Sequence, residues 1–449
     1  MPDAPRHPLA RHGRLPRRHA WGTLVGFVAS ALAVLLVSGT SVAAIAGAQL
    51  ASAPDTVELS KDDQNTASTA DITAMRGGAN ILLIGSDTRI GQFDSSENVE
   101  GARNDVTILV HISQDHQQLT AVSFPRDLKV PIPACTNPET GTSYPAASSE
   151  LINESLGHGG ISCVVDTVEN LTGLNIPYAG LITFDGVIEM SNALGGVDVC
   201  VAKPIDDSYI GLQLSAGQHS LAGEDALKFL RSRHGVGDGS DLARISSQQV
   251  FLSALLRKVT SDGTLSNPIT LYKLAGAALS NMTLSDGLAQ TRTLVGLAST
   301  LRGMSTSDML FVQYPVIDDP TDSAHVLVDA DPAHALNVAL QQDRKTSLTD
   351  SSTGRASEES PTASGTPSPS AGAGEAAAGG ASSAPSDTGS TSGTPDTTGG
   401  SASDTSGGST SDASGGSTSG EPAATQSATP LPSSISGQSA SEQTCTVGN

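Results

Sequence analysis

Val106-Thr107-Ile108-Leu109-Val110-His111-Ile112 is the stretch that decides the fold, because it is an uninterrupted β-branched and apolar run. Similar runs stand on either side of it, at Ile81–Ile84 and at Leu119–Phe124. Continuous apolar runs of this length, bounded by turn residues, are typical of strands that are buried on both faces of a sheet. Three of them in succession predict the centre of a β-sheet.

Helical patterns alternate with further strands after this sheet. Amphipathic stretches predict helices at 164–171, 186–194, 223–231 and 242–259, with more helical sequence to about residue 301. Short apolar runs predict strands at 181–184, 197–201 and 311–317. This mixture predicts an α/β or α+β sandwich over residues 77–345, which is long enough for one large core.

The N-terminus has the pattern of a membrane anchor. Residues 1–18 contain five Arg, and residues 21–54 contain no charged side chain. We interpret 1–20 as a cytoplasmic segment, 21–48 as a single transmembrane helix and 49–76 as an extracellular stalk, because basic residues stay on the cytoplasmic side. A cleavable signal peptide is the alternative, since Ala46-Gly47-Ala48 resembles a cleavage site.

The C-terminal part is rich in Ser, Thr, Gly and Ala. From residue 346 to 449 it contains no Phe, Tyr or Trp, which predicts a disordered tail. Four cysteines suit an oxidising exterior, and they allow three pairings if all are bridged. We expect Cys135 to pair with Cys163, which leaves the partners of Cys200 and Cys445 open.

The net charge of −22 argues against nucleic-acid binding, because neutralising phosphates along a duplex requires a basic surface. The charge is unevenly distributed, however. The tail has ten acidic residues and one Arg, whereas several Arg of the central domain stand in short motifs. A small group of Arg within an acidic domain remains compatible with one phosphate-containing ligand.

An Arg and an Asp stand beside each of the three central strands. In chain order the pairs are Asp87 with Arg89, Arg103 with Asp105, and Arg126 with Asp127. If the strands are neighbours, these pairs meet at one edge of the sheet. Guanidinium groups bind phosphate oxygens bidentately, and Mg²⁺ takes one or two carboxylates together with phosphate oxygens. The set therefore indicates a pyrophosphate site with a divalent cation.

Further polar residues lie around the junction of two predicted helices. They are Arg231, Arg233, Asp241, Arg244 and Gln248. Three of them have a structural explanation as well: Arg231 and Arg233 near a helix C-terminus complement the helix dipole, and Asp241 suits a helix N-cap. A single Arg–Asp pair is more often a surface ion pair. We interpret His234 as a loop residue and Asp206-Asp207 as a solvated turn.

The motifs resemble those of the LytR–CpsA–Psr family of bacterial envelope proteins. The resemblance covers about 79–259 and includes Asn80-Ile-Leu-Leu-Ile-Gly-Ser-Asp-Thr-Arg89, Arg103-Asn-Asp-Val-Thr107, Ser123-Phe-Pro-Arg-Asp127, Gly195-Gly-Val-Asp-Val199, Leu230-Arg-Ser-Arg-His234 and Asp241-Leu-Ala-Arg-Ile-Ser-Ser-Gln-Gln249. Three positions depart from the family pattern: Asn104 replaces a usual Ser, Ser247 a common Arg and Leu151 a frequent Lys. The Ala-, Gly- and Thr-rich composition hints at an actinobacterial source.

The resemblance implies a membrane-anchored transferase. Such enzymes move a glycopolymer from a polyprenyl-pyrophosphate carrier to peptidoglycan, and an apolar tunnel in their α/β sandwich holds the lipid. By motif position, Asp87 and Asp105 would bind Mg²⁺ or Mn²⁺. The residues that would bind or polarise the pyrophosphate are Arg89, Arg103, Arg126, Arg231, Arg233, Arg244 and Gln248.

Two other functions use the same sequence features. One is hydrolysis of the lipid pyrophosphate in the same pocket, and the other is non-enzymatic wall binding through the tail. For transfer, a sugar hydroxyl attacks the phosphorus attached to the polymer, and polyprenyl phosphate leaves. Asp127 and Asp241 are both candidates for the general base. The sequence does not identify the polymer.

Overall fold

The computed structural model describes residues 56–59, 78–86, 103–137, 141–261, 268–349, 353–360 and 428–449. Its middle strands are the three predicted runs, β2 (Ala79–Ser86), β3 (Asn104–Ile112) and β4 (Leu119–Phe124). β3 is antiparallel to both neighbours, with Gly85 opposite Val106 and Thr107 opposite Phe124. The end of β2, the start of β3 and the end of β4 therefore meet at one edge of the sheet, as predicted.

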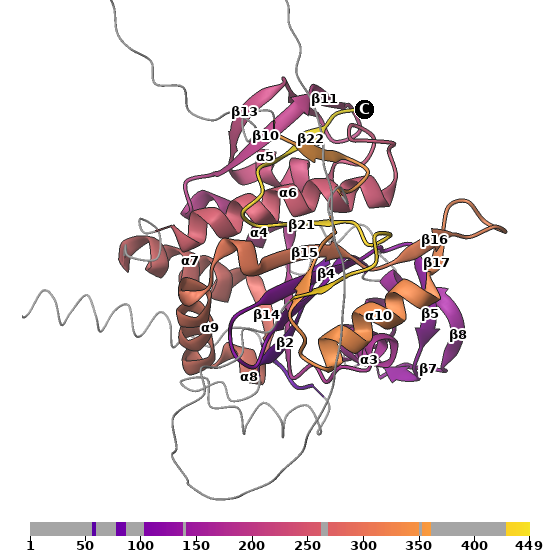
Figure 1. The fold of residues 1–449 in the computed structure, drawn as a ribbon. Helices are drawn as coiled ribbons and strands as arrows, with labels where there is room; N and C mark the ends of the chain where they lie inside the picture. Colours follow the sequence, from indigo (N-terminus) through magenta and orange to yellow (C-terminus); the bar gives the residue numbers. More distant parts are fainter. Residues whose placement is uncertain are drawn as a thin grey trace, which may run out of the picture. The chain divides into compact units, whose positions relative to one another are not determined.

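The central sheet is mixed and has the order β1-β14-β9-β2-β3-β4-β15-β21 (Figure 1). Its outer strands are β1 (Thr56–Val57), β14 (Met282–Ser285), β9 (Tyr178–Ile182), β15 (Met309–Gln313) and β21 (Gly437–Ser439). β9 is parallel to β2, and β15 is parallel to β4. The predicted combination of a central sheet with helices is therefore confirmed, and the sheet is mixed.

Two smaller four-stranded sheets accompany the central one. The first consists of β13 (Gly217–Leu221), β10 (Val197–Lys203), β22 (Thr444–Val447) and β19 (Ser357–Glu359). The second consists of β16 (Val316–Asp318), β17 (Val326–Val328), β5 (Leu128–Ile132) and β8 (Ala147–Leu151). The two-stranded pairs are β6 (Cys135–Thr136) with β7 (Ser143–Tyr144), β11 (Ile205–Asp207) with β12 (Leu212–Leu214), and β18 (Thr346–Ser347) with β20 (Thr429–Pro430).

Alternate residues of β2 pack into two different cores. Leu82 and Ile84 join a core with α3 (Ser155–Thr172) and α10 (Ala330–Gln341) on one face of the sheet. Ile81 and Leu83 join a second core on the other face. The helices of this second face are α7 (Pro268–Asn281), α8 (Asp286–Ala289) and α9 (Thr291–Gly303). A strand that is covered on both faces explains why β2 has no polar alternation.

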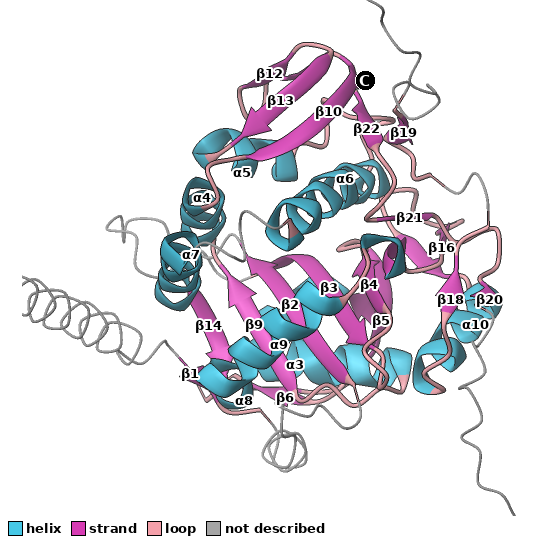
Figure 2. Cartoon of the chain, turned by 60° about the vertical axis from the view of Figure 1, so that its left-hand side comes forward, coloured by secondary structure: helices cyan, strands magenta, loops and turns pink. Residues whose placement is uncertain are grey.

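Helix α6 (Asp241–Thr260) lies between the central sheet and the first small sheet (Figure 2). Leu252 and Leu256 pack toward the central sheet, whereas Phe251 and Ala254 pack against β10 and α5 (Gly223–Arg231). The remaining long helix, α4 (Phe184–Ala193), packs against α5 and α7. Because α6 is buried on two sides, its polar first turn is held firmly between the two sheets.

The prediction that 346–449 is wholly disordered is wrong for its described parts. Residues 346–347 and 357–359 form β18 and β19, and residues 428–449 add β20, β21 and β22. We call 428–449 the C-terminal strap. It buries Leu431, Ile435 and Cys445, so this short segment contains enough apolar surface to dock.

Two disulfides are present. Cys135 pairs with Cys163, as expected, and Cys200 of β10 pairs with Cys445 of β22. The second bridge crosslinks residues 245 positions apart and joins the strap to the first small sheet.

The predicted cytoplasmic segment, the transmembrane helix at 21–48 and most of the stalk lie outside the described residues. Among the helices within the described ranges, none is both long and apolar enough to cross a bilayer.

Candidate active site

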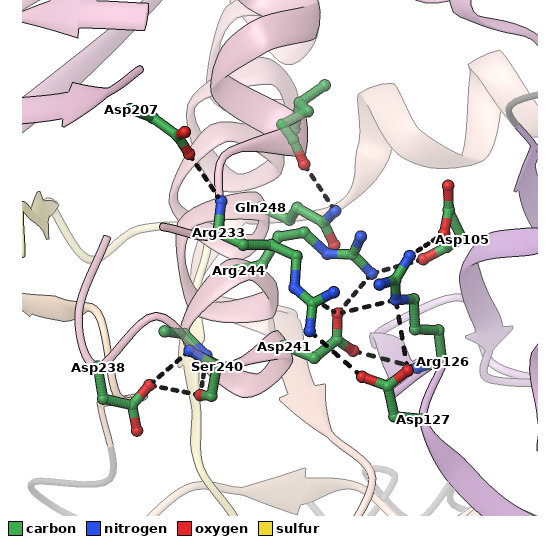
Figure 3. Close-up of polar contacts among 12 residues, drawn as sticks. Asp105, Arg126, Asp127, Asp207, Arg233, Asp238, Ser240, Asp241, Arg244 and Gln248 are labelled. Atoms are coloured by element: carbon green, nitrogen blue, oxygen red, sulfur yellow. Dashed lines mark hydrogen bonds and ion pairs between the residues drawn. The ribbon is translucent and has the colours of Figure 1, made fainter. Parts of the chain in front are cut away.

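Three Arg side chains and three Asp side chains converge at the edge of the central sheet. Arg126 and Asp127 follow β4, Asp105 lies in β3, Arg233 lies in the loop between α5 and α6, and Asp241 and Arg244 open α6. We call Arg126, Arg233 and Arg244 the arginine cluster (Figure 3). The convergence follows from the antiparallel order of β2, β3 and β4 and from the position of α6 against the same edge.

Arg126 makes the largest number of these contacts. Its Nη1 donates to Asp105 Oδ1 at 2.5 Å, and its backbone N–H donates to Asp241 Oδ2 at 3.1 Å. Its Nε lies 3.4 Å from Asp127 Oδ1. Burial lowers the pKa of Arg126, but hydrogen bonding to Asp105 and the charges of the three carboxylates outweigh this effect and raise the pKa overall. Arg126 therefore stays fully cationic.

Asp241 and Arg244 form the buried base of the cluster. Arg244 Nη2 lies 2.7 Å from Asp241 Oδ1 and donates to the Asp105 backbone oxygen at 2.7 Å. The α6 N-cap is Ser240, whose Oγ accepts from the Ala243 N–H at 3.2 Å. The predicted N-cap role of Asp241 is therefore wrong. Asp241 is the first residue after the N-cap, and its carboxylate points at the Arg side chains (Figure 3).

The cluster contains donors that are not used by the protein. The Nε atoms of Arg126, Arg233 and Arg244 are buried and make no hydrogen bond within the described residues. The carboxylates nearest to the Nε atoms of Arg126 and Arg233 are ion-pair partners at 3.4 Å and 4.0 Å. Such buried donors are costly unless a ligand satisfies them. Burial also lowers the pKa of Arg244, and the charge of Arg126 adds to this effect, whereas the charge of Asp241 opposes it. An anionic ligand in the pocket would accept hydrogen bonds from the free Nε atoms and would also stabilise the buried charge of Arg244.

Asp127 has an environment unlike that of an exposed carboxylate. Arg233 Nη2 lies 3.4 Å from its Oδ2. Even so, burial first and the nearby Asp241 second raise the pKa of Asp127 above its ordinary value. A carboxyl group with a raised pKa next to the arginine cluster is a better proton acceptor than a free aspartate.

The other predicted site residues lie at differing distances from the arginine cluster, and two of them are not described. Gln248 is buried and donates from Nε2 to the Leu230 backbone oxygen at 2.9 Å. Arg231 lies over the Phe184 ring, 4.3 Å from its centroid. Arg103 is peripheral: its side chain is 59% exposed and pairs with Glu154 at 3.0 Å. Asp87 and Arg89 lie outside the described residues.

A cavity of ≈ 530 Å³ adjoins the cluster. Asp105, Arg126, Arg231, Arg233, Arg244 and Gln248 line its polar part. Most of the remaining lining is apolar and includes Ile108, Val187, Leu230, Phe251 and Leu255. The cavity therefore offers a cationic end and an apolar body, a combination that suits an amphiphile with an anionic head.

Within the described part of the chain, no group of three or more His, Cys, Asp or Glu side chains is arranged to hold a metal ion. Asp105 is nevertheless placed at the polar end of the cavity. One carboxylate with phosphate oxygens fits the usual Mg²⁺ ligand set, since this ion needs few protein ligands.

The sequence interpretation of Asp206-Asp207 as a solvated turn is wrong for one of the two residues. Asp207 is only 1% exposed, and its carboxylate contacts the loop that carries Arg233. No local pattern distinguishes Asp207 from the exposed Asp206, because its partners lie more than twenty positions away. Glu154 and Phe184, which contact two predicted Arg, also had no sequence signal.

Residues 44–342 match the model of the LytR-CpsA-Psr family, and this range is more than half of the chain. The chain belongs to the LytR–CpsA–Psr family. Among the curated relatives of this family member is the cell wall biosynthesis protein LcpA of Corynebacterium glutamicum, which is 27% identical over 66% of this chain and 61% of LcpA. The chain thus spans about three fifths of the length of LcpA.

A second relative is TagT of Bacillus subtilis, named polyisoprenyl-teichoic acid–peptidoglycan teichoic acid transferase. It is 30% identical over 53% of this chain and 70% of TagT. Among solved structures, protein gbs0355 of Streptococcus agalactiae matches with a TM-score of 0.50 and 20% identity, over 64% of this chain and 91% of that one. This likeness shows that the two chains share a fold.

Proposed function

We propose that this protein transfers a glycopolymer from a polyprenyl-pyrophosphate carrier to peptidoglycan, through a phosphodiester linkage, in cell-wall assembly. The observation that carries the proposal is the cavity that joins three buried, unused guanidinium donors to an apolar body. Pyrophosphate matches the donors, and a polyprenyl chain matches the apolar lining. Family membership and the name of TagT as a teichoic acid transferase support the same chemistry.

In the proposed reaction, a peptidoglycan hydroxyl attacks the phosphorus that carries the polymer. A new P–O bond forms, the bridging P–O bond breaks, and polyprenyl phosphate leaves with the electron pair. Arg126, Arg233 and Arg244 stabilise the negative charge on the non-bridging oxygens. Asp127 accepts the hydroxyl proton, because burial and Asp241 raise its pKa.

Asp105 and Asp87 would hold a divalent cation, Mg²⁺ or Mn²⁺, with the substrate phosphates. When bound, this cation would neutralise charge on the pyrophosphate. Asp105 Oδ1 already pairs with Arg126, so this carboxylate orients the guanidinium as well. The membrane anchor at 21–48 would keep the domain next to its lipid substrate on the outer side of the cell membrane.

The test is transfer of a labelled saccharide from a polyprenyl-pyrophosphate carrier to isolated peptidoglycan. We expect Arg126→Ala to lower kcat by about 10²-fold, as loss of one preorganised donor does at other charge-stabilising sites. Arg126→Lys should remain impaired, because an ammonium keeps the charge and loses the planar fork. Arg302→Ala, an exposed Arg of α9, is the matched control.

Two outcomes would change the assignment. Full activity of Arg126→Ala would remove the arginine cluster from the reaction. Release of free polymer, with no product joined to peptidoglycan, would show that the same pocket hydrolyses the lipid pyrophosphate instead.

A further inference from the structure

The loop between α5 and α6 carries Arg233 into the arginine cluster. α5 ends at Arg231 and α6 begins at Asp241, so the backbone of the intervening residues is outside both helices. Helical hydrogen bonding therefore does not fix the position of Arg233. Its guanidinium is 3.4 Å from Asp127, and its Nε is free of hydrogen bonds within the described residues. Another contact must hold the loop.

Asp207 supplies this contact from the end of β11. Its Oδ2 accepts three hydrogen bonds from the loop: from Ser232 Oγ at 2.8 Å, from the Arg233 N–H at 3.2 Å and from the Gly235 N–H at 3.2 Å. Its Oδ1 accepts from the Tyr209 N–H at 3.2 Å. Figure 3 shows the bond from Asp207 to the backbone nitrogen of Arg233.

The backbone is packed tightly around this carboxylate. A Cβ at Gly235 would lie 2.8 Å from Asp207 Cβ, which is closer than real Cβ contacts, and 3.1 Å from the Asp207 nitrogen, which is tighter than most of them. A residue with a side chain at 235 would push the loop away from Asp207. The close approach and the three hydrogen bonds are separate observations, and both hold the loop against β11.

We propose that Asp207 is a positioning residue for Arg233 in pyrophosphate binding, an inference that rests on the proposed function. A carboxylate that accepts several N–H and O–H groups is strongly stabilised in its charged form, and it fixes the donors in return. Because the described hydrogen bonds of its two oxygens are with the β11–β12 turn and the α5–α6 loop, Asp207 acts through the backbone of Arg233.

Geranylgeranyl pyrophosphate is a suitable probe, because it has a pyrophosphate and a short polyprenyl chain. Calorimetric titration of the full chain gives its Kd for the wild type, Asp207→Ala, Asp207→Asn and Gly235→Ala. Asp206→Ala is the matched control, since Asp206 is the exposed neighbour and its carboxylate accepts only a 3.4 Å bond from Gln213. We expect about tenfold weaker binding for Asp207→Ala and no change for Asp206→Ala.

A double-mutant cycle separates positioning from a general structural effect. In the Arg233→Ala background, Asp207→Ala should cause no further loss, because the side chain that it positions is already absent. Amide hydrogen exchange provides a readout that needs no ligand: exchange at Arg233 and Gly235 should be faster in Asp207→Ala and unchanged in Asp206→Ala. If Asp207→Ala is poorly folded, Asp207→Asn and Gly235→Ala give the same comparison.

The outcomes are distinguishable. Equal loss of binding in the wild-type and Arg233→Ala backgrounds, or unchanged amide exchange at Arg233 and Gly235, would overturn the role of Asp207. Absence of probe binding by the wild type, together with faster exchange in Asp207→Ala, would overturn the proposed function and leave the anchoring of the loop in place.

Discussion

Asp127 is the residue whose protonation most directly links the site to pH. Its carboxyl group lies between Arg126 and Arg233, which favour the charged form, but burial and Asp241 outweigh them. Its pKa is therefore raised from the ordinary 3.8. A raised pKa is what a general base requires near neutral pH, where it must be ionised and still attract a proton.

For this single residue we predict that kcat rises with pH as Asp127 ionises. Asp127→Asn should lower kcat and remove this rising limb, because an amide cannot accept the hydroxyl proton. The measurement is the kcat of the transfer reaction as a function of pH, from about pH 4 to pH 8, for the wild type and for Asp127→Asn. A rising limb that persists in Asp127→Asn would assign the base role to another group, with Asp241 as the next candidate.

The raised pKa of Asp127 also affects stability: the free energy of unfolding should fall with pH over the range in which kcat rises. Folded Asp127 binds its proton more tightly than the unfolded chain does, so ionisation favours unfolding. The contribution of Asp127 to the free energy of unfolding is therefore greatest below the ordinary pKa of 3.8 and falls as pH rises through the raised pKa. Denaturant unfolding of wild type and Asp127→Asn across this window should show the difference.

Among the elements, the C-terminal strap contacts more separate parts of the fold than its length suggests. Its strand β21 extends the central sheet beside β15, and β22 pairs with both β10 and β19. At the end of β22 the Gly237 N–H donates to the Val447 oxygen at 3.0 Å, and after β22 the Asn449 N–H donates to the Gly235 oxygen at 3.0 Å. The strap therefore supports the Arg233 loop from a second side.

We predict that the Cys200–Cys445 bridge stabilises the fold more than the Cys135–Cys163 bridge does. The two bridges span 245 and 28 positions, and crosslinking a longer loop restricts the unfolded chain more. The difference in unfolding free energy between Cys200→Ser/Cys445→Ser and Cys135→Ser/Cys163→Ser should be about 2 kcal/mol. Urea unfolding of the two double variants gives this comparison directly.

Equal losses in the two variants would mean that the strand pairing of β22, and not the bridge, retains the strap. Transfer activity adds a second readout. The strap contacts the loop of Arg233, so Cys200→Ser/Cys445→Ser should lose activity at lower urea concentrations than Cys135→Ser/Cys163→Ser.

At the scale of the whole molecule, the low-complexity segment joins two parts of one domain. Residues 364–426 separate from the rest of the chain as their own unit, and the flanking residues 353–360 and 428–449 both belong to the domain. The segment is therefore an insertion between β19 and β20. A deletion that tests the wall-binding alternative must spare the strap, because removing all of 346–449 would also remove strands.

We predict that replacing 364–426 by a Gly/Ser linker of about 20 residues, with an r.m.s. span of about 25 Å, leaves Tm and kcat unchanged. Removal of 364–449 should lower Tm strongly, because it takes away β20 to β22 and the partner of Cys200. Thermal unfolding and the transfer assay measure both effects. Loss of peptidoglycan binding in the linker variant, with no transfer by the wild type, would support the non-enzymatic alternative.

The sequence by itself determined the middle strands of the central sheet, the helices between residues 155 and 303 and the polar residues at the ends of those strands, but not α10. These features follow from local patterns: an apolar run such as Val106–Ile112 forms a buried strand, and antiparallel order brings Asp105 beside Arg126. Only the tertiary structure decided the contacts of Asp207, the exposure of Arg103 and the docking of the strap. Each depends on contacts between residues far apart in the chain, and hydrophobic periodicity contains no information about such partners. Asp206 and Asp207 are identical in type and adjacent, and they differ only in which one faces the Arg233 loop.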